Sequence, residues 1–284
     1  MRLLLLDAHT LESSRQLFDG SDLLIIDEVG QVRHRWLNEA TRGWIRRLAP
    51  PRWRTPVVSG SEAWAVRAAW TSLLIAIASH PSVAWLTSLD RLFFAENKLV
   101  QARTARAIGL PVPATSVAAC AEDVPAELGP LLVVKPLGPG HFTDDQGDER
   151  VLWSEPLERS APELARLRGA PFILQEHLEA ESHLRVVTVR ERVWICSLDA
   201  KGLPLDWRRQ EEAHAAFEVS HDPIVGEAAL RMARASGVGY SSQDWIRSRG
   251  HAYFVELNPA GQWLFLPEPT ASEVSAEIAA WLIA

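Results

Sequence analysis

The sequence has few cysteines and no long apolar run, and each absence excludes a class of protein. Its two cysteines, Cys120 and Cys196, do not form a CxxC motif, so neither a zinc ribbon nor a disulfide scaffold is expected. Free thiols favour a reducing cytoplasm as the compartment. Asp7 interrupts the leucine run at the start of the chain, and the apolar stretch around Thr71–Ser79 is much shorter than a membrane span.

Positive charge is not in excess either. The chain has 29 Lys and Arg against 36 Asp and Glu, a formal net charge of -7 at pH 7, which argues against nucleic acid as the main partner. Its 284 residues, 47% of them hydrophobic, suffice for one large soluble unit or two to three packed subdomains. Tryptophan is abundant, with 12 residues, and we expect most of these rings in the core or lining grooves.

The pattern of apolar residues changes near Ala95. Before it, short apolar runs at Leu3–Leu6 and Leu23–Ile26 predict buried strands, Ser61–Ala78 predicts a helix, and Val83–Leu86 predicts another strand. These elements indicate a small α/β unit at the N-terminus.

Beyond Ala95 the pattern predicts a helix over Glu96–Ile108, which Gly109 and two following prolines would end. The later apolar runs predict strands at Leu131–Val134, Phe172–Glu176, Leu184–Val189 and Val193–Leu198, a helix at Ile224–Ser236, and a final hairpin of Gln243–Ile246 with Ala252–Leu257.

The final hairpin carries the most informative polar residues. Asp244 and Glu256 lie equally far from Gly250, so a hairpin symmetric about it, turning through Arg247–His251, would place them opposite each other. Asn258 would share the face of Glu256. Carboxylates that face each other repel unless a cation lies between them, and oxygen ligands suit magnesium or manganese. The alternative is a solvent-facing side of the hairpin in a slipped register.

Two lysines stand where phosphate could bind. Lys98 opens the helix after Asn97, and Lys135 ends a strand before a loop of glycine and proline; a lysine beside free backbone N–H groups suits phosphate oxygens. The strand Phe172–Glu176 runs into a short polar linker, which could offer backbone groups to a purine. A solvated surface lysine and an ordinary strand end are the simpler interpretations.

Three arginines could grip a phosphoryl group through bidentate hydrogen bonds. Arg185 starts a strand after the acidic segment Glu179–Glu181, while Arg208 and Arg209 follow Trp207. For any one of them, a surface salt bridge is the alternative.

Taken in order, these segments resemble the ATP-grasp ligases. The segments are NKLVQARTARAIGLPVPAT (Asn97–Thr115), VVKPLG (Val133–Gly138), QEHL (Gln175–Leu178), LRVVTVRERVW (Leu184–Trp194), DWRR (Asp206–Arg209) and FVELNPAGQW (Phe254–Trp263). The branch they resemble most is the macrocycle-forming ligases of microviridin-type peptides, the graspetide synthetases. The similarity covers about residues 95–270, with a weaker one at Trp44–Arg47.

The resemblance implies an α/β (α+β) ATP-grasp fold, with a small N-terminal domain (1–94) and two subdomains that clasp ATP (95–180 and 181–284). It implies roles for the matching residues. Phosphate contacts would come from Lys98 and Lys135, the adenine site from Gln175, Glu176 and Leu178, metal ligands from Asp244, Glu256 and Asn258, and phosphoryl stabilisation from Arg185, Arg208 and Arg209. His183 stands where relatives carry an acidic residue. The segment His141–Gly147 would be a lid.

The expected activity is an ADP-forming carboxylate ligase that uses ATP with Mg²⁺, or Mn²⁺ in its place. It would form an acyl phosphate and then an amide or ester. A ribosomal precursor peptide is the expected partner, with a free amino acid or small peptide, as in glutathione synthetase-like enzymes, as the alternative. A small-molecule kinase and a nucleotide-binding protein without turnover are further alternatives. The resemblance also implies a homodimer.

Overall fold

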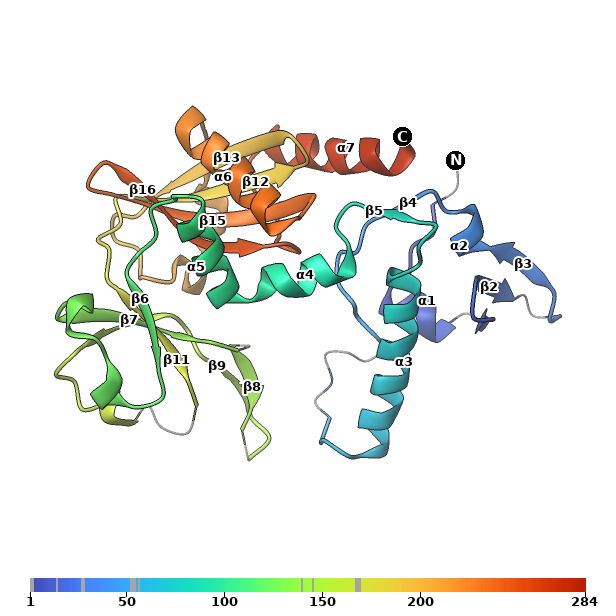
Figure 1. Ribbon diagram of the computed structural model, residues 1–284, viewed down its shortest axis with the longest axis horizontal. Coiled ribbons are helices and arrows are strands. Elements are labelled where there is room, and N and C mark those ends of the chain that lie inside the picture. Colours follow the sequence, from blue (N-terminus) through green and yellow to red (C-terminus); the bar gives the residue numbers. More distant parts are fainter. Residues whose placement is uncertain are drawn as a thin grey trace.

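The computed structural model describes residues 3–13, 15–26, 29–51, 55, 57–138, 140–144, 146–166 and 170–284. Figure 1 shows two groups of elements linked by α4 (Leu89–Glu96). The N-terminal group carries α3 (Glu62–Ala78), and the other group carries the two largest sheets, of four and five strands. Among the described residues, no helix is long and apolar enough to cross a membrane.

The N-terminal group is built around a three-stranded antiparallel sheet in the order β1-β2-β3. The predicted strand at Leu3–Leu6 is wrong, because residues 3–7 form no regular element. This segment also has no free edge beside the next predicted strand, β2 (Leu23–Ile26), because β1 and β3 pair with its two edges. The remaining elements of the group are α1 (Ala8–Ser13), β1 (Arg15–Phe18), β2 (Leu23–Ile26), β3 (Val32–Arg35), α2 (Trp36–Glu39), β4 (Arg42–Gly43), α3 (Glu62–Ala78) and β5 (Ala84–Trp85).

The predicted helix at Ser61–Ala78 is confirmed as α3. Ser61 caps it, and its hydroxyl accepts a hydrogen bond from the Trp64 backbone N–H, which satisfies one of the free donors of the first turn. The predicted strand at Val83–Leu86 is the short β5, which pairs with β4 in parallel.

A four-stranded antiparallel sheet follows, in the order β10-β7-β11-β6. It confirms the predicted strands around Lys135 and at Phe172–Glu176. The segment predicted as a lid contributes β8, which pairs with β9; Asp145 lies outside the described residues, and the lid remains a prediction. The strands are β6 (Thr115–Ala118), β7 (Leu131–Pro136), β8 (His141–Thr143), β9 (Glu149–Val151), β10 (Glu155–Glu158) and β11 (Phe172–Glu176), with short 3₁₀ turns at Ala121–Asp123, Ala126–Leu128 and Leu164–Arg166.

The C-terminal sheet has five antiparallel strands in the order β14-β13-β12-β15-β16. Its strands and helices are β12 (Ser182–Val189), β13 (Arg192–Asp199), β14 (Glu218–Ser220), β15 (Tyr240–Ser248), β16 (His251–Asn258), α6 (Pro223–Ser236) and α7 (Thr270–Ile283), with 3₁₀ turns η4 (Trp207–Arg209) and η5 (Glu211–Ala216). The strands and the helix that the sequence predicts here are confirmed, with longer bounds.

Each face of this sheet has its own core. Leu184 and Val186 of β12 pack with α6, whereas Val187 and Val189 pack with α7, as the alternation of a strand requires. Helix α5 (Lys98–Ala107) also packs on this sheet, against α6 and β16. The predicted domain boundaries, after residues 94 and 180, remain a prediction.

Candidate active site

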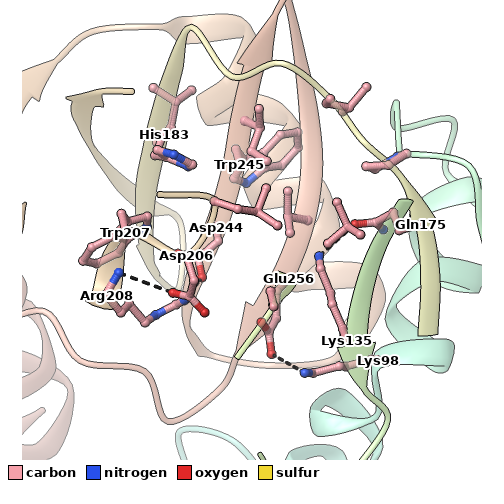
Figure 2. A pocket seen from close by; sticks show the side chains of 18 of the residues that line it. Lys98, Lys135, Gln175, His183, Asp206, Trp207, Arg208, Asp244, Trp245 and Glu256 are labelled. Carbon is pink, nitrogen blue, oxygen red and sulfur yellow. Dashed lines mark hydrogen bonds and ion pairs between the residues drawn. The ribbon is translucent and has the colours of Figure 1, made fainter. Parts of the chain in front are cut away.

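A cavity of about 80 Å³ lies between the four-stranded sheet and the C-terminal sheet. Strands β7 and β11 supply one wall, and β12, β15 and β16 supply the other. Figure 2 shows its polar side chains converging from both sides. The predicted site residues that line it are Lys98, Lys135, Gln175, Glu176, Leu178, Arg208, Asp244 and Glu256. Arg185, Arg209 and Asn258 do not line it.

The hairpin of β15 and β16 places Asp244 directly opposite Glu256, as predicted. The predicted turn is wrong, however. The strands continue to Ser248 and His251, and the turn is only Arg249–Gly250, both with positive φ (51° and 75°), the geometry of a tight hairpin turn.

A bulge restores the predicted pairing. The real turn is centred between Arg249 and Gly250, which alone would shift the register by one residue. The register shifts back between Asp244 and Trp245, where Val255 is the extra residue on β16. Because of this bulge, Glu256 faces the cavity while its neighbour Leu257 is buried in the core.

Asp244 is held between two arginines. Its Oδ1 accepts a hydrogen bond from Arg185 Nη1 at 2.7 Å, and its Oδ2 accepts one from Arg208 Nη2. Burial alone would raise the pKa of Asp244, but the two guanidinium groups outweigh it and lower the pKa to about 2. The charge of Asp244 in turn raises the pKa of Arg208. This carboxylate therefore stays ionised with cationic partners on both oxygens.

Glu256 has a cation beside it as well, since its Oε1 lies 3.8 Å from Lys98 Nζ (Figure 2). Two carboxylates facing one cavity fit a divalent cation, and their oxygen atoms suit Mg²⁺. The third predicted ligand, Asn258, lines a neighbouring cavity together with Glu256. Its Oδ1 accepts the Ala260 backbone N–H at 2.9 Å.

Among the described residues, no three His, Cys, Asp or Glu side chains gather as a metal cluster. The predicted set has only two carboxylates, and its third ligand is an amide.

Arg185 is buried behind Asp244, with a side chain 7% exposed. Its Nη2 donates to the Gln262 carbonyl at 3.0 Å, and its Nε has no hydrogen-bond partner in the described structure. Gly261 allows this packing, because a Cβ there would lie 3.2 Å from Arg185 Nη2 and 2.4 Å from the Ser242 Cβ. Arg185 therefore positions Asp244 from behind.

Lys135 reaches the cavity at the end of a chain of hydrogen bonds. Its Nζ donates to Gln175 Oε1 at 2.8 Å, and Gln175 Nε2 donates to Thr115 Oγ1 at 2.9 Å. Burial lowers the pKa of Lys135 to about 8, with Lys98 adding to the effect and Glu256 opposing it. The side chain of Gln175, predicted at the adenine site, thus orients this lysine.

Arg209 does not line the cavity, and its Nη1 donates to Glu155 Oε1 at 2.6 Å. This position gives no support to the predicted catalytic role, which stays a prediction. His183 does line the cavity and is buried. Burial lowers its pKa, although Asp244 acts in the opposite direction, so the neutral imidazole is favoured.

Sequence reasoning missed two residues that support the site. Asp206 caps η4 by accepting the Arg208 backbone N–H at 3.3 Å, and it also accepts from Arg208 Nη1 at 3.3 Å. An aspartate two residues before Arg208 is a capping signal that could have identified it. Gln101, on α5, is buried and bonds to both the N–H and the carbonyl of Leu257 (2.9 and 2.7 Å). Nothing in the sequence pattern indicates this contact.

This arrangement of a four-stranded and a five-stranded sheet around a basic and acidic cavity is the ATP-grasp fold. No protein-family model matches the chain, and no curated protein matches its sequence. Solved structures do match it, at low sequence identity. The resemblance to peptide-maturing ATP-grasp ligases is thus confirmed at the level of the fold.

Among these structures are a macrocyclase and a ligase, each bound to a peptide. One is the macrocyclase MdnC of Microcystis aeruginosa with its precursor peptide MdnA (TM-score 0.75, 20% identity, covering 96% of this chain and 87% of the other). The second is a RiPP-associated ATP-grasp ligase of Chryseobacterium gregarium with ADP and a leader and core peptide (TM-score 0.79, 20% identity, 95% and 84%). A third, D-alanine–D-alanine ligase of Bacillus anthracis with ATP, is less similar (TM-score 0.51, 16% identity, 77% and 73%).

Proposed function

We propose that this protein is an ATP- and Mg²⁺-dependent ligase that activates a carboxylate of a precursor peptide and joins it to an amine or hydroxyl. The observation that carries the proposal is the convergence of Lys135 from one sheet with Asp244 and Glu256 from the other on a single cavity. The similarity to peptide-bound ATP-grasp ligases supports a peptide as the substrate.

Each residue has a role in this proposal. Lys98 and Lys135 would bind the nucleotide phosphates, and Arg208 would stabilise charge on the γ-phosphoryl group. Asp244 and Glu256 would hold Mg²⁺, with Asn258 at the edge of the site. When bound, the metal ion would neutralise charge on the phosphate oxygens.

The reaction has two steps. A carboxylate oxygen of the peptide attacks the γ-phosphorus, and ADP leaves with the bridging oxygen. The acyl phosphate is then attacked at its carbonyl carbon by an amine or hydroxyl, which loses a proton while phosphate leaves. The second step requires water to be excluded, and the segment His141–Gly147 is our candidate for the lid.

The test combines the purified protein with ATP, Mg²⁺ and synthetic peptides encoded by the short reading frames that flank its gene. We expect ADP release together with a peptide that has lost the mass of one water for each bond formed. Glu256→Gln provides the inactive control. ADP release no greater than with this control would refute the proposal, and a phosphorylated but uncondensed product would indicate a kinase.

A homodimer is a further part of the proposal, carried by the resemblance alone. Light scattering of the purified protein tests it, and a monomeric mass at micromolar concentration would contradict it.

A further inference from the structure

A cavity of about 410 Å³ opens at the edge of the C-terminal sheet. It is bounded by β13, β14, the first turns of α6 and the start of α7, and Figure 1 shows α6 lying against this sheet. Its volume is within the range of small-molecule sites, about 300–1,000 Å³. The lining residues are Val193, Trp194, Ile195, Val219, Ser220, His221, Asp222, Pro223, Gly226, Glu227, Leu230 and Thr270.

This edge cavity is separate from the candidate active site, and the two share no described lining residue. On β12, Leu184 and Val186 pack towards α6, so Arg185 between them faces the opposite side of the sheet. The edge cavity lies on the α6 side, where Gly226 is next to Val193. None of the roles proposed above for nucleotide, metal ion or peptide uses its residues.

The floor of the edge cavity is apolar. Val193 and Ile195 of β13 and Leu230 of α6 contribute to it. Gly226 adds no side chain to this floor, and a Cβ there would lie 3.4 Å from Val193 Cγ1. At the rim, Val219 of β14 is 57% exposed. A ligand with a hydrocarbon part would gain free energy by removing these surfaces from water.

The charges at the edge cavity favour a cation. Its carboxylates are Asp222 and Glu227, and none of the described residues that line it is a lysine or an arginine. Asp222 is compensated, because it accepts hydrogen bonds from Arg247 and from two backbone N–H groups of α6. Glu227 is not: Arg234 lies 3.6 Å from it but 2.5 Å from Glu191. Two carboxylates therefore share one guanidinium group.

The edge of β13 beside the cavity offers backbone groups as well. Strand β14 pairs with β13 only at Ile195–Ser197. Among the described strands, none pairs with Arg192–Trp194 on this side. A strand edge without a partner presents backbone carbonyl and N–H groups to a neighbouring molecule, and such a carbonyl can accept a hydrogen bond from an ammonium or guanidinium group.

We propose that the edge cavity binds a small organic cation, an ammonium or guanidinium group carried on a hydrocarbon stem. The stem lies on the apolar floor, and the cation pairs with Glu227 and reaches the edge of β13. A free amine and the side chain of a lysine in a peptide supply the same chemistry. The inference does not rest on the proposed function, because it uses no residue of the candidate active site.

Three probes with one hydrocarbon body and different charges test the inference: phenylbutylamine, phenylbutanol and phenylbutyrate. Each is titrated into isotope-labelled protein and followed by two-dimensional NMR, which reports affinity and location together. We expect the amine to bind about fivefold more tightly than the alcohol, as for a partly exposed ion pair, and the carboxylate to bind more weakly than the alcohol. Backbone signals of Val193 and Gly226 should shift, whereas those of Lys135 and Gln175 should not.

Glu227→Gln tests the charge with little risk to the fold, since this side chain is 60% exposed. The variant should bind the amine and the alcohol equally. The matched control is Glu218→Gln, because Glu218 is exposed on β14 and does not line the cavity; it should keep the preference for the amine. Gly226→Val should weaken all three probes about tenfold, equivalent to two methylene groups losing their contact, and thermal unfolding checks its fold.

Three outcomes would each overturn the inference: equal binding of amine and alcohol by the wild type, a preference for the amine that survives in Glu227→Gln, or signal shifts confined to other surfaces. The titrations contain neither ATP nor Mg²⁺, so their result is independent of ligase activity.

The source of the cation is decided by comparing butylamine with acetyl-Gly-Lys-Gly-amide, which share a stem and an ammonium group. Tighter binding of the tripeptide in this cavity would assign the cation to a peptide, whose backbone can pair with the edge of β13. Binding of butylamine that is equal or tighter would assign the cavity to a free amine. Either result supports the proposed class of ligand, and binding of neither probe at the cavity would count against it.

Discussion

The lowered pKa of Lys135 makes nucleotide binding sensitive to pH in a range where few other side chains titrate. Its pKa of about 8 results chiefly from burial. Phosphate oxygens beside the amine would favour its protonated form, so binding should draw a proton from solution. The experiment therefore compares titrations with ATP and Mg²⁺ that are carried out at pH 7 and at pH 9.

The size of the effect follows from this pKa. The free protein carries the proton on about 90% of molecules at pH 7 and on about 10% at pH 9. If the amine stays protonated in the complex, the dissociation constant rises about tenfold between these values, or about 1.4 kcal/mol. At pH 8 about half a proton is taken up for each nucleotide bound.

Isothermal titration calorimetry in two buffers with different ionisation enthalpies measures both quantities. Lys135→Met is the control, because it fills similar space and cannot titrate; it should bind ATP more weakly and take up no proton from this position. Ionisation of the nucleotide is common to both proteins and cancels in the comparison. An affinity of the wild type that stays constant from pH 7 to 9, or equal proton uptake by the two proteins, would refute the reasoning.

The same lowered pKa has a consequence for stability. Between pH 8 and about 10.5 the unfolded chain retains the proton that the folded chain has lost at Lys135. The unfolded state then binds more protons, so the contribution of this group to the free energy of unfolding increases with pH across that window.

Three further predictions concern single residues. Glu256→Gln should reduce ATP turnover at least about 100-fold with little change in the thermal unfolding midpoint, and near-normal ADP release would count against the metal site. Gln101→Leu leaves the buried N–H and carbonyl of Leu257 without their side-chain partner and should cost about 2–3 kcal/mol in urea unfolding; a loss below about 0.5 kcal/mol would show that the contact is dispensable. Arg209→Gln tests the predicted catalytic role of Arg209: the contact with Glu155 outside the cavity leads us to expect a kcat within about twofold of the wild type, whereas a 100-fold loss would support the predicted role.

The sequence was sufficient to predict that Asp244 and Glu256 lie opposite each other on the hairpin, although the reasoning from symmetry was incomplete. A tight turn at Arg249–Gly250 and a bulge at Val255 shift the register in opposite senses, and the pairing of Asp244 with Glu256 survives. The spacing of Phe254 and Leu257 in the sequence indicates the bulge. Both are buried in the same core although they are three residues apart, which a regular strand does not allow.

Other features depend on contacts between distant segments and could not be predicted from local pattern. Arg208 and Arg209 are adjacent in sequence, yet one faces Asp244 and the other faces Glu155 on β10. The backbone of η4 determines which of the two arginines faces Asp244. Its course depends on the packing of Trp207 against Phe217 and Phe265. The contact of Gln101 with Leu257 spans 156 residues of sequence, so no spacing rule could indicate it.

The two arginines on Asp244 supply the folded chain with its own counter-ions. Arg185 and Arg208 neutralise the charge of the Asp244 carboxylate, so the fold needs no metal ion to do so. A chelator should therefore leave the protein folded. A metal ion arriving alone would have to displace the Arg208 guanidinium from its anionic partner. A nucleotide offers that guanidinium a second anion, so nucleotide and metal ion would bind far better together than either would alone.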